Sequence, residues 1–96
     1  LVIAHPETGR KALFVNPGYS AHIVGLERAE SHAMLRFLCR HVASSSFVYS
    51  HHWRPGDLVL WDEMMALHRA PNDFGDHPRK VVRVTAGRVV PTAAHR

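Results

Sequence analysis

The sequence contains one cysteine, no long apolar run and no low-complexity tract. A single cysteine among 96 residues, Cys39, cannot form an internal disulfide, which favours a reducing compartment such as the cytoplasm. We expect Cys39 to be a small buried side chain. No apolar run is long enough to span a bilayer, and the first residues lack the basic segment and cleavage site of a signal peptide. We therefore expect a cytoplasmic protein with no membrane partner.

Acidic residues are outnumbered by basic ones. The chain has 8 Asp and Glu against 12 Lys and Arg, which gives a net charge of +4 with neutral histidines. Such an excess can attract nucleic acid or anionic substrates. Most of the arginines are scattered, and only Arg28, His32, Arg36 and Arg40 form a stripe at helical spacing. We interpret this stripe as a solvated helix face, so a nucleic-acid partner is not expected.

Short strands dominate the predicted elements. Apolar and β-branched runs predict strands at 1–4, 12–15, 47–53, 58–61, 66–70 and 80–85. The run at 58–61 is nearly unbroken, so we expect it to be buried on both faces. The sequence predicts a turn at 5–10 and fraying from Gly87 to Arg96.

One helix is predicted, at about 27–43. Its apolar positions recur at helical spacing, and we expect them to face the core; they are Ala33, Met34, Phe37, Leu38 and Val42. The fold class is therefore mainly β with one helix, typical of a sandwich or jelly-roll. These few strands would leave unpaired edges, and the chain starts at Leu1 rather than Met. We interpret residues 1–96 as a partial domain with the helix inserted between strands.

Three residues near the C-terminal end are suited to binding a metal and an anion. His68 ends an apolar segment, and imidazole is the commonest metal ligand. A single histidine in an apolar segment is more often a hydrogen-bonded core residue. Arg79 and Arg83 are four residues apart, which places them on one face of a strand. They can bind a carboxylate or sulfonate bidentately, or they can lie on a solvated sheet edge.

Several segments, in order, resemble the Fe(II)/2-oxoglutarate-dependent taurine dioxygenase family. The segment His5-Pro6-Glu7-Thr8-Gly9-Arg10, continued by Val15-Asn16-Pro17-Gly18-Tyr19, resembles the His-Pro-x-Thr-Gly and Val-Asn-x-Gly-aromatic motifs of that family. The segment Trp53-Arg54-Pro55-Gly56-Asp57, with Trp61-Asp62 and His68, resembles its Trp-x-Pro-x-Asp and Trp-Asp-Asn-Arg-x-Thr-x-His motifs. His77-x-Arg79 and Arg83-x-Thr85 resemble the arginine strand that follows.

The resemblance implies a role for each matched position. His68 corresponds to the distal histidine of a two-histidine, one-carboxylate Fe(II) site. Arg79 corresponds to the arginine that binds the co-substrate 2-oxoglutarate. Arg83 corresponds to an arginine near the substrate's anionic group, Tyr19 to an aromatic on the substrate side and Trp61 to an aromatic close to the iron. We expect these three to bind the substrate, and no separate catalytic residue is implied. The implied fold is the C-terminal portion of a double-stranded β-helix (jelly-roll) oxygenase, with the N-terminal half absent.

The implied activity is hydroxylation of a small, anionic organic substrate with O₂, coupled to decarboxylation of 2-oxoglutarate to succinate. We expect a homo-oligomer in the full-length protein. The alternative is an inactive remnant or an anion-binding fragment. A nucleic-acid binder that uses the stripe on 27–43 is a third hypothesis.

The chain also departs from the family pattern. Glu63-Met64-Met65-Ala66 stands where the family has Asn-Arg-x-Thr, which would change the partners that orient the metal ligand. The family's upstream His-x-Asp pair is missing. His5-x-Glu7 has a similar form but suits a turn better, and His51-His52 would point to opposite faces of a strand.

Overall fold

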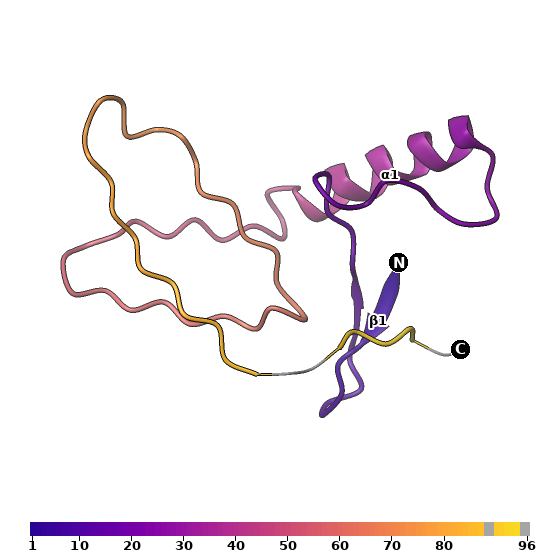
Figure 1. The fold of residues 1–96 in the computed structure, drawn as a ribbon, viewed down its shortest axis with the longest axis horizontal. Coiled ribbons are helices and arrows are strands. Elements are labelled where there is room, and N and C mark those ends of the chain that lie inside the picture. Colours follow the sequence, from indigo (N-terminus) through magenta and orange to yellow (C-terminus); the bar gives the residue numbers. More distant parts are fainter. Residues whose placement is uncertain (88–89, 95–96) are drawn as a thin grey trace.

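The structure is a computed structural model that describes residues 1–87 and 90–94. Along the chain it contains strand β1 (Val2–Ala4), strand β2 (Lys11–Leu13) and helix α1 (Arg28–Val42). Its radius of gyration is 16.1 Å, against about 12–13 Å for a compact domain of this length. The chain is therefore open, and a long extended segment after α1 lies away from the helix and the sheet (Figure 1).

β1 and β2 form an antiparallel hairpin around the predicted turn. Ile3 lies opposite Ala12. The His5 N–H donates to the Arg10 carbonyl at 2.9 Å, and the Gly9 N–H donates to the His5 carbonyl at 2.8 Å. Gly9 has a φ of +68°, which glycine adopts at no steric cost. The predicted first strand and turn are confirmed, and the second strand lies one residue earlier at its start and two earlier at its end.

The C-terminal segment 92–94 lies along the other edge of β1. Ala93 forms an antiparallel bridge with Ile3, and the Ala94 N–H donates to the Val2 carbonyl at 3.0 Å. The expected fraying of the tail is therefore wrong for this segment, because backbone hydrogen bonds hold it against β1. The tail's other parts at 88–89 and 95–96 lie outside the described residues.

Helix α1 confirms the predicted helix, with Glu27 and Ala43 as its caps. The Glu30 carboxylate accepts the Glu27 N–H at 3.3 Å, which satisfies a donor that the first turn leaves free. Arg40 and His41 lie in the last turn, where the helix dipole favours positive charge. No helix in residues 1–87 and 90–94 is long and apolar enough to cross a membrane.

The buried face of α1 differs from the predicted one. Ser31 and Leu35 are 1% and 6% exposed, whereas Met34 and Phe37 are 45% and 64% exposed. The loop before the helix explains the difference, because the Ile23 N–H donates to Ser31 Oγ at 2.7 Å. This bond places the loop against the Ser31 side of the helix and leaves the predicted core face partly open.

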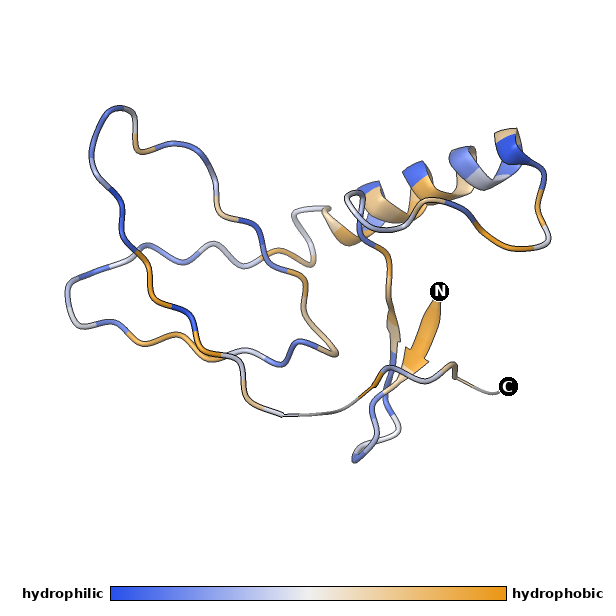
Figure 2. Cartoon of the chain, viewed as in Figure 1, coloured by the Kyte–Doolittle hydropathy of each residue, from blue (hydrophilic) through white to orange (hydrophobic). Residues whose placement is uncertain are grey.

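Few side chains are fully buried. The buried apolar residues of the described chain are Ile3, Val15 and Leu35. Cys39 is half-buried, so the expectation of a buried thiol is wrong. Figure 2 shows that hydrophobic residues also lie along the open loops. The described residues therefore carry much apolar surface that they do not themselves cover.

The strands predicted at 47–53, 58–61, 66–70 and 80–85 are not strands in the part of the chain that the structure describes. They follow an open, extended course (Figure 1) without the backbone partners that define a strand. Leu58 and Leu60 are 93% and 95% exposed, so 58–61 is not buried on both faces. Val59 and Trp61, which alternate with these leucines, are half-buried. This period of two is typical of an extended segment with one covered face.

We predict that Ser31→Ala destabilises the protein. Removing the hydroxyl leaves the Ile23 N–H without its acceptor in a part-buried position, which costs about 1–3 kcal/mol. Denaturant unfolding would measure this loss in the free energy of unfolding. Ser45→Ala, at an exposed serine, is the control and should change stability by less than about 0.5 kcal/mol. Equal stabilities of the two variants would contradict the prediction.

Candidate functional site

Four side chains from two segments form one group, here called the His68 cluster: Trp61, Glu63, His68 and Arg83. The rings of Trp61 and His68 have centroids 5.0 Å apart at 48°. Arg83 Nη1 donates to His68 Nε2 at 3.0 Å. The Glu63 carboxylate accepts from Trp61 Nε1 at 3.2 Å, and its same oxygen is 3.8 Å from Arg83 Nη1. The structure thus brings together three of the predicted site residues and adds Glu63.

A turn at Asp62 sets the geometry of this cluster. The Asp62 carbonyl accepts the N–H groups of Met65 and Ala66 at 3.2 and 2.9 Å, and its Oδ1 accepts the Met64 N–H at 2.8 Å. An aspartate that bonds to the backbone two residues ahead favours a turn over a continuing strand. This reversal lets Trp61 and His68 face each other.

His5 ties the β-hairpin to this turn. Its Nε2 lies 2.9 Å from Asp62 Oδ2, and its Nδ1 accepts the N–H groups of Glu7 and Thr8, each at 3.2 Å. A backbone N–H can only donate, so Nδ1 carries no proton and Nε2–H donates to the carboxylate. Both ring nitrogens are thus engaged, and His5-x-Glu7 does not form a metal-binding pair in this structure.

Among the described residues, neither Arg79 nor Tyr19 forms a hydrogen bond or ion pair with the His68 cluster. The Arg79 guanidinium lies over the Phe74 ring, 5.5 Å from its centroid. Tyr19 is 90% exposed on a turn in which the Asn16 carbonyl accepts its N–H at 3.1 Å. The side-chain contacts among the described residues connect neither of them to His68 or Arg83.

His68 fits a metal ion as one ligand. Because Arg83 can only donate, His68 Nε2 carries no proton and accepts the Arg83 N–H with its lone pair, the same lone pair with which imidazole binds metals. A cation on Nε2 would require the guanidinium to withdraw, since both are positive. No group of three histidine, cysteine or carboxylate side chains in residues 1–87 and 90–94 could hold a metal. The described residues therefore offer one ligand of such a site and not a complete set.

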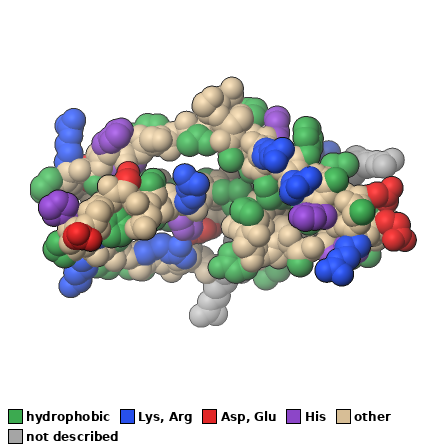
Figure 3. Space-filling model, turned by 90° about the horizontal axis from the view of Figure 1, so that it is seen from above, with side chains coloured by type: hydrophobic (Ala, Val, Ile, Leu, Met, Phe, Trp, Pro, Cys, Tyr) green, Lys and Arg blue, Asp and Glu red, His purple; other side chains and the backbone are tan. Residues whose placement is uncertain are grey.

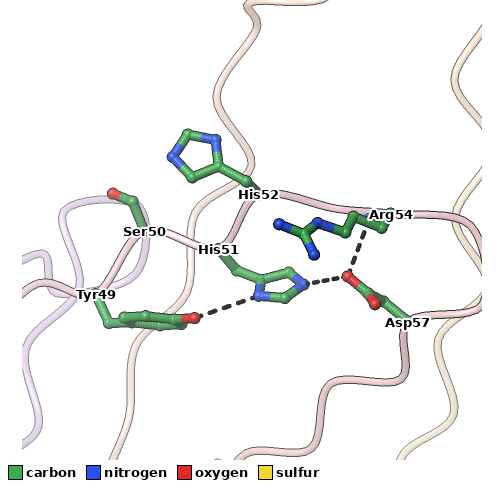
Figure 4. A pocket seen from close by; sticks show the side chains of 6 residues that line it. All are labelled: Tyr49, Ser50, His51, His52, Arg54 and Asp57. Atoms are coloured by element: carbon green, nitrogen blue, oxygen red, sulfur yellow. Dashed lines mark hydrogen bonds and ion pairs between the residues drawn. The ribbon is translucent and has the colours of Figure 1, made fainter.

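A second histidine–aspartate pair lies elsewhere, at an open pocket of about 340 Å³. His51 Nε2 lies 3.0 Å from Asp57 Oδ2, and the Tyr49 hydroxyl is 3.5 Å from His51 Nδ1. Figure 4 shows the His51 ring between Tyr49 and Asp57, while His52 points away from them. The two adjacent histidines therefore point in different directions in this structure.

The basic stripe on α1 is solvent-exposed throughout, as expected for a solvated helix face. Two of its members, Arg28 and His32, line an open pocket with Ala21 and His22. Figure 3 shows Lys, Arg and His side chains dispersed over one face of the molecule.

Comparison with known proteins identifies the class. The family described as "Taurine catabolism dioxygenase TauD, TfdA family" matches residues 1–85, and the chain belongs to this family. Relatives of the chain are named α-ketoglutarate-dependent dioxygenases, and these names imply Fe(II) and 2-oxoglutarate for those enzymes. The resemblance recognised in the sequence is thereby confirmed. No solved structure matches the chain.

Individual relatives cover most of the chain. An alkylsulfatase from Acinetobacter baylyi is 36% identical over 99% of the chain and 30% of its own length. A 2,4-dichlorophenoxyacetate dioxygenase from Cupriavidus pinatubonensis is 44% identical over 72% of the chain and 24% of its own length. An (S)-phenoxypropionate dioxygenase from Sphingobium herbicidovorans is 48% identical over 73% of the chain and 24% of its own length. The chain thus spans less than a third of each of these relatives.

Sequence reasoning missed the roles of Asp62 and Glu63. Asp62 was visible as part of the Trp-Asp motif, but its contact with His5 depends on the fold. Glu63 was visible as a departure from the family pattern, but its bonds to Trp61 and Arg83 depend on the turn between them. The sequence signal for both residues is their position, since Asp62 and Glu63 are adjacent acidic residues that directly follow Trp61 and the apolar run before it.

We predict weak coupling between Glu63 and Arg83. The two side chains are 44% and 51% exposed, and such pairs contribute less than about 1 kcal/mol. A double-mutant cycle with Glu63→Gln and Arg83→Gln would measure the coupling from free energies of unfolding. In Glu63→Gln the amide oxygen can still accept from Trp61 Nε1, so the cycle isolates the charge. A coupling above about 2 kcal/mol would show that the pair is desolvated in the folded protein.

Proposed function

We propose that this chain is the C-terminal part of an Fe(II)/2-oxoglutarate-dependent dioxygenase that hydroxylates a small anionic organic molecule. In the balanced reaction, 2-oxoglutarate becomes succinate and CO₂, one oxygen atom of O₂ enters succinate and the other enters the substrate's new hydroxyl group. The observation that carries the proposal is the His68 cluster. It sets an unprotonated imidazole nitrogen beside an indole and a guanidinium.

Each residue has a distinct part in this proposal. His68 would hold the iron together with ligands from outside this chain, and the iron would supply the redox centre at which O₂ reacts. Trp61 would orient the imidazole by ring contact. Arg79 would bind the distal carboxylate of 2-oxoglutarate, and Arg83 and Tyr19 would bind the substrate. Binding and orientation of this kind are the protein's contribution to a cofactor reaction.

The neighbours of Arg83 support an anionic substrate. Arg83 has one short contact, to the neutral nitrogen of His68, and one longer contact, to Glu63. A substrate carboxylate or sulfonate would offer the guanidinium two charge-assisted hydrogen bonds in place of these. The relatives include an alkylsulfatase and two dioxygenases named for phenoxy acids. The compounds in these names carry a sulfate or a carboxylate, which are both anionic.

The open extended segments support a double-stranded β-helix as the complete fold. Leu58, Leu60, Val82 and Val84 are each at least 80% exposed, and the backbone around them has no strand partner in the described residues. In folded proteins, extended segments with unpaired backbone edges and exposed apolar side chains pair with further strands. The remaining polypeptide of a relative-sized chain would supply such strands.

The alternative is an anion-binding fragment without catalysis. It is favoured by the single metal ligand among the described residues and by Glu63, whose carboxylate stands where the family has asparagine. Iron binding separates the two functions, because an anion-binding fragment needs Arg79 or Arg83 but no metal.

We predict that His68→Ala abolishes Fe(II) binding in the protein at its natural length. Anaerobic titration with Fe(II) and 2-oxoglutarate should produce the weak visible charge-transfer band of the chelate in the unmodified protein. The variant should lose the band, because one of the three protein ligands is gone. His52→Ala, at an exposed histidine that is not a member of the cluster, should keep it. An unchanged band in His68→Ala would contradict the assignment, and no band in the unmodified protein would favour the anion-binding alternative.

We predict that Arg79→Ala raises the KM for 2-oxoglutarate by on the order of 10- to 100-fold, since hydrogen bonds to charged groups contribute about 1.5–3 kcal/mol. The value of kcat should change less, because the lost contact is to a part of the co-substrate that does not react. Steady-state kinetics with varied 2-oxoglutarate would measure both. Arg79→Lys should recover part of the loss, since it keeps the charge without the bidentate fork. A normal KM in Arg79→Ala would rule out this role.

A further inference from the structure

We propose that the hydrogen bond between His5 and Asp62 is a positioning device that holds Trp61 against His68. The predicted effect on iron binding rests on the proposed function, whereas the positioning of Trp61 by His5 and Asp62 does not. His5 and Asp62 are positioning residues, because they act through Trp61 and the turn and do not touch the cluster's polar atoms themselves.

The first support is the fixed orientation of His5. Its side chain is 15% exposed, and its Nδ1 is occupied by two backbone N–H groups of the hairpin turn. These bonds set the ring's rotation and its tautomer, so Nε2–H has one direction in which to donate. That direction is occupied by Asp62 Oδ2 at 2.9 Å.

The second support is the double role of Asp62. One carboxylate oxygen accepts the Met64 N–H and shapes the turn, while the other accepts from His5. The carboxylate is thus bound from both sides, by its own turn and by a distant hairpin. A carboxylate with both oxygens engaged has little rotational freedom, so it transmits the position of the hairpin to the turn.

The third support is the peptide bond that joins Asp62 to Trp61. Trp61 directly precedes Asp62, and its ring contacts the imidazole of His68 at a centroid distance of 5.0 Å. Without the bridge, the cluster would depend on the half-exposed Glu63 and Arg83 contacts, which restrain little. The bridge joins a ring that is 15% exposed to a carboxylate that is 45% exposed, and it ties the turn before His68 to the hairpin of β1 and β2.

Two substitutions remove the bridge while keeping each local turn. In Asp62→Asn, the amide oxygen can still accept the Met64 N–H, but the amide nitrogen cannot accept from His5 Nε2–H. In His5→Asn, the amide oxygen can still accept the N–H groups of Glu7 and Thr8, but the shorter side chain does not reach Asp62. Asp57→Asn is the matched control, since it alters a histidine–aspartate pair of the same chemistry outside the cluster.

NMR on the protein at its natural length tests the structural claim without iron. Long-range ¹⁵N–¹H correlations should show the His5 ring protonated on Nε2 and bare on Nδ1. Ring-to-ring nuclear Overhauser contacts between Trp61 and His68 should be present in the unmodified protein and in Asp57→Asn. They should be lost in Asp62→Asn and His5→Asn, and the double variant should behave like each single one. A His5 ring protonated on Nδ1, or retained contacts in both bridge variants, would overturn the proposal.

The functional consequence is measured by the Fe(II) and 2-oxoglutarate titration. Residues that orient a metal ligand typically affect metal affinity by 10- to 100-fold, so each bridge variant should weaken iron binding by about tenfold or more. Unchanged iron affinity in both variants would overturn the positioning role. If the unmodified protein binds no iron, the proposed function fails, whereas the NMR contacts still decide whether His5 and Asp62 position Trp61.

Discussion

The contact on which the site depends is the hydrogen bond from His5 to Asp62. It joins the β1–β2 hairpin at one end of the chain to the turn that precedes His68. Other contacts of the His68 cluster are either close in sequence, as between Trp61 and Glu63, or half-exposed, as between Glu63 and Arg83. A long-range bond to a nearly buried ring restrains the chain more strongly than these, because it fixes the turn relative to the small sheet.

Apart from the bonds of segment 92–94 to β1, the remaining organisation is local and open. The hairpin, the Asp62 turn and α1 are each closed by bonds between residues a few positions apart, whereas the long segment after α1 has extended backbone and exposed leucines and valines. The family match and the partial coverage of the relatives give this openness a physical reading. Under the proposed double-stranded β-helix fold, these apolar segments would pair with strands from the rest of the protein.

Local features of the fold were predictable. The helix follows from apolar spacing with acidic residues at its start and basic residues at its end, and the first turn follows from its proline and glycine. Features that need a neighbour were not predictable. The buried face of α1 is set by the Ile23–Ser31 bond. The segments predicted as strands after the helix have strand-forming residues, but a strand also needs a neighbouring strand to bond to, and the described residues supply none.

For the candidate site, the sequence by itself determined the chemical groups: an imidazole, an indole and two guanidiniums in an order that resembles one enzyme family. The tertiary structure decided which of them meet. Trp61 and His68 come together because the Asp62 turn reverses the chain between them, and Arg83 joins them through its hydrogen bond to His68. Arg79 lies on Phe74 and Tyr19 faces solvent. The identity of each residue can be read directly from the sequence. Which distant segments lie close together depends on backbone turns and long-range hydrogen bonds, and their geometry cannot be read from the order of residues alone.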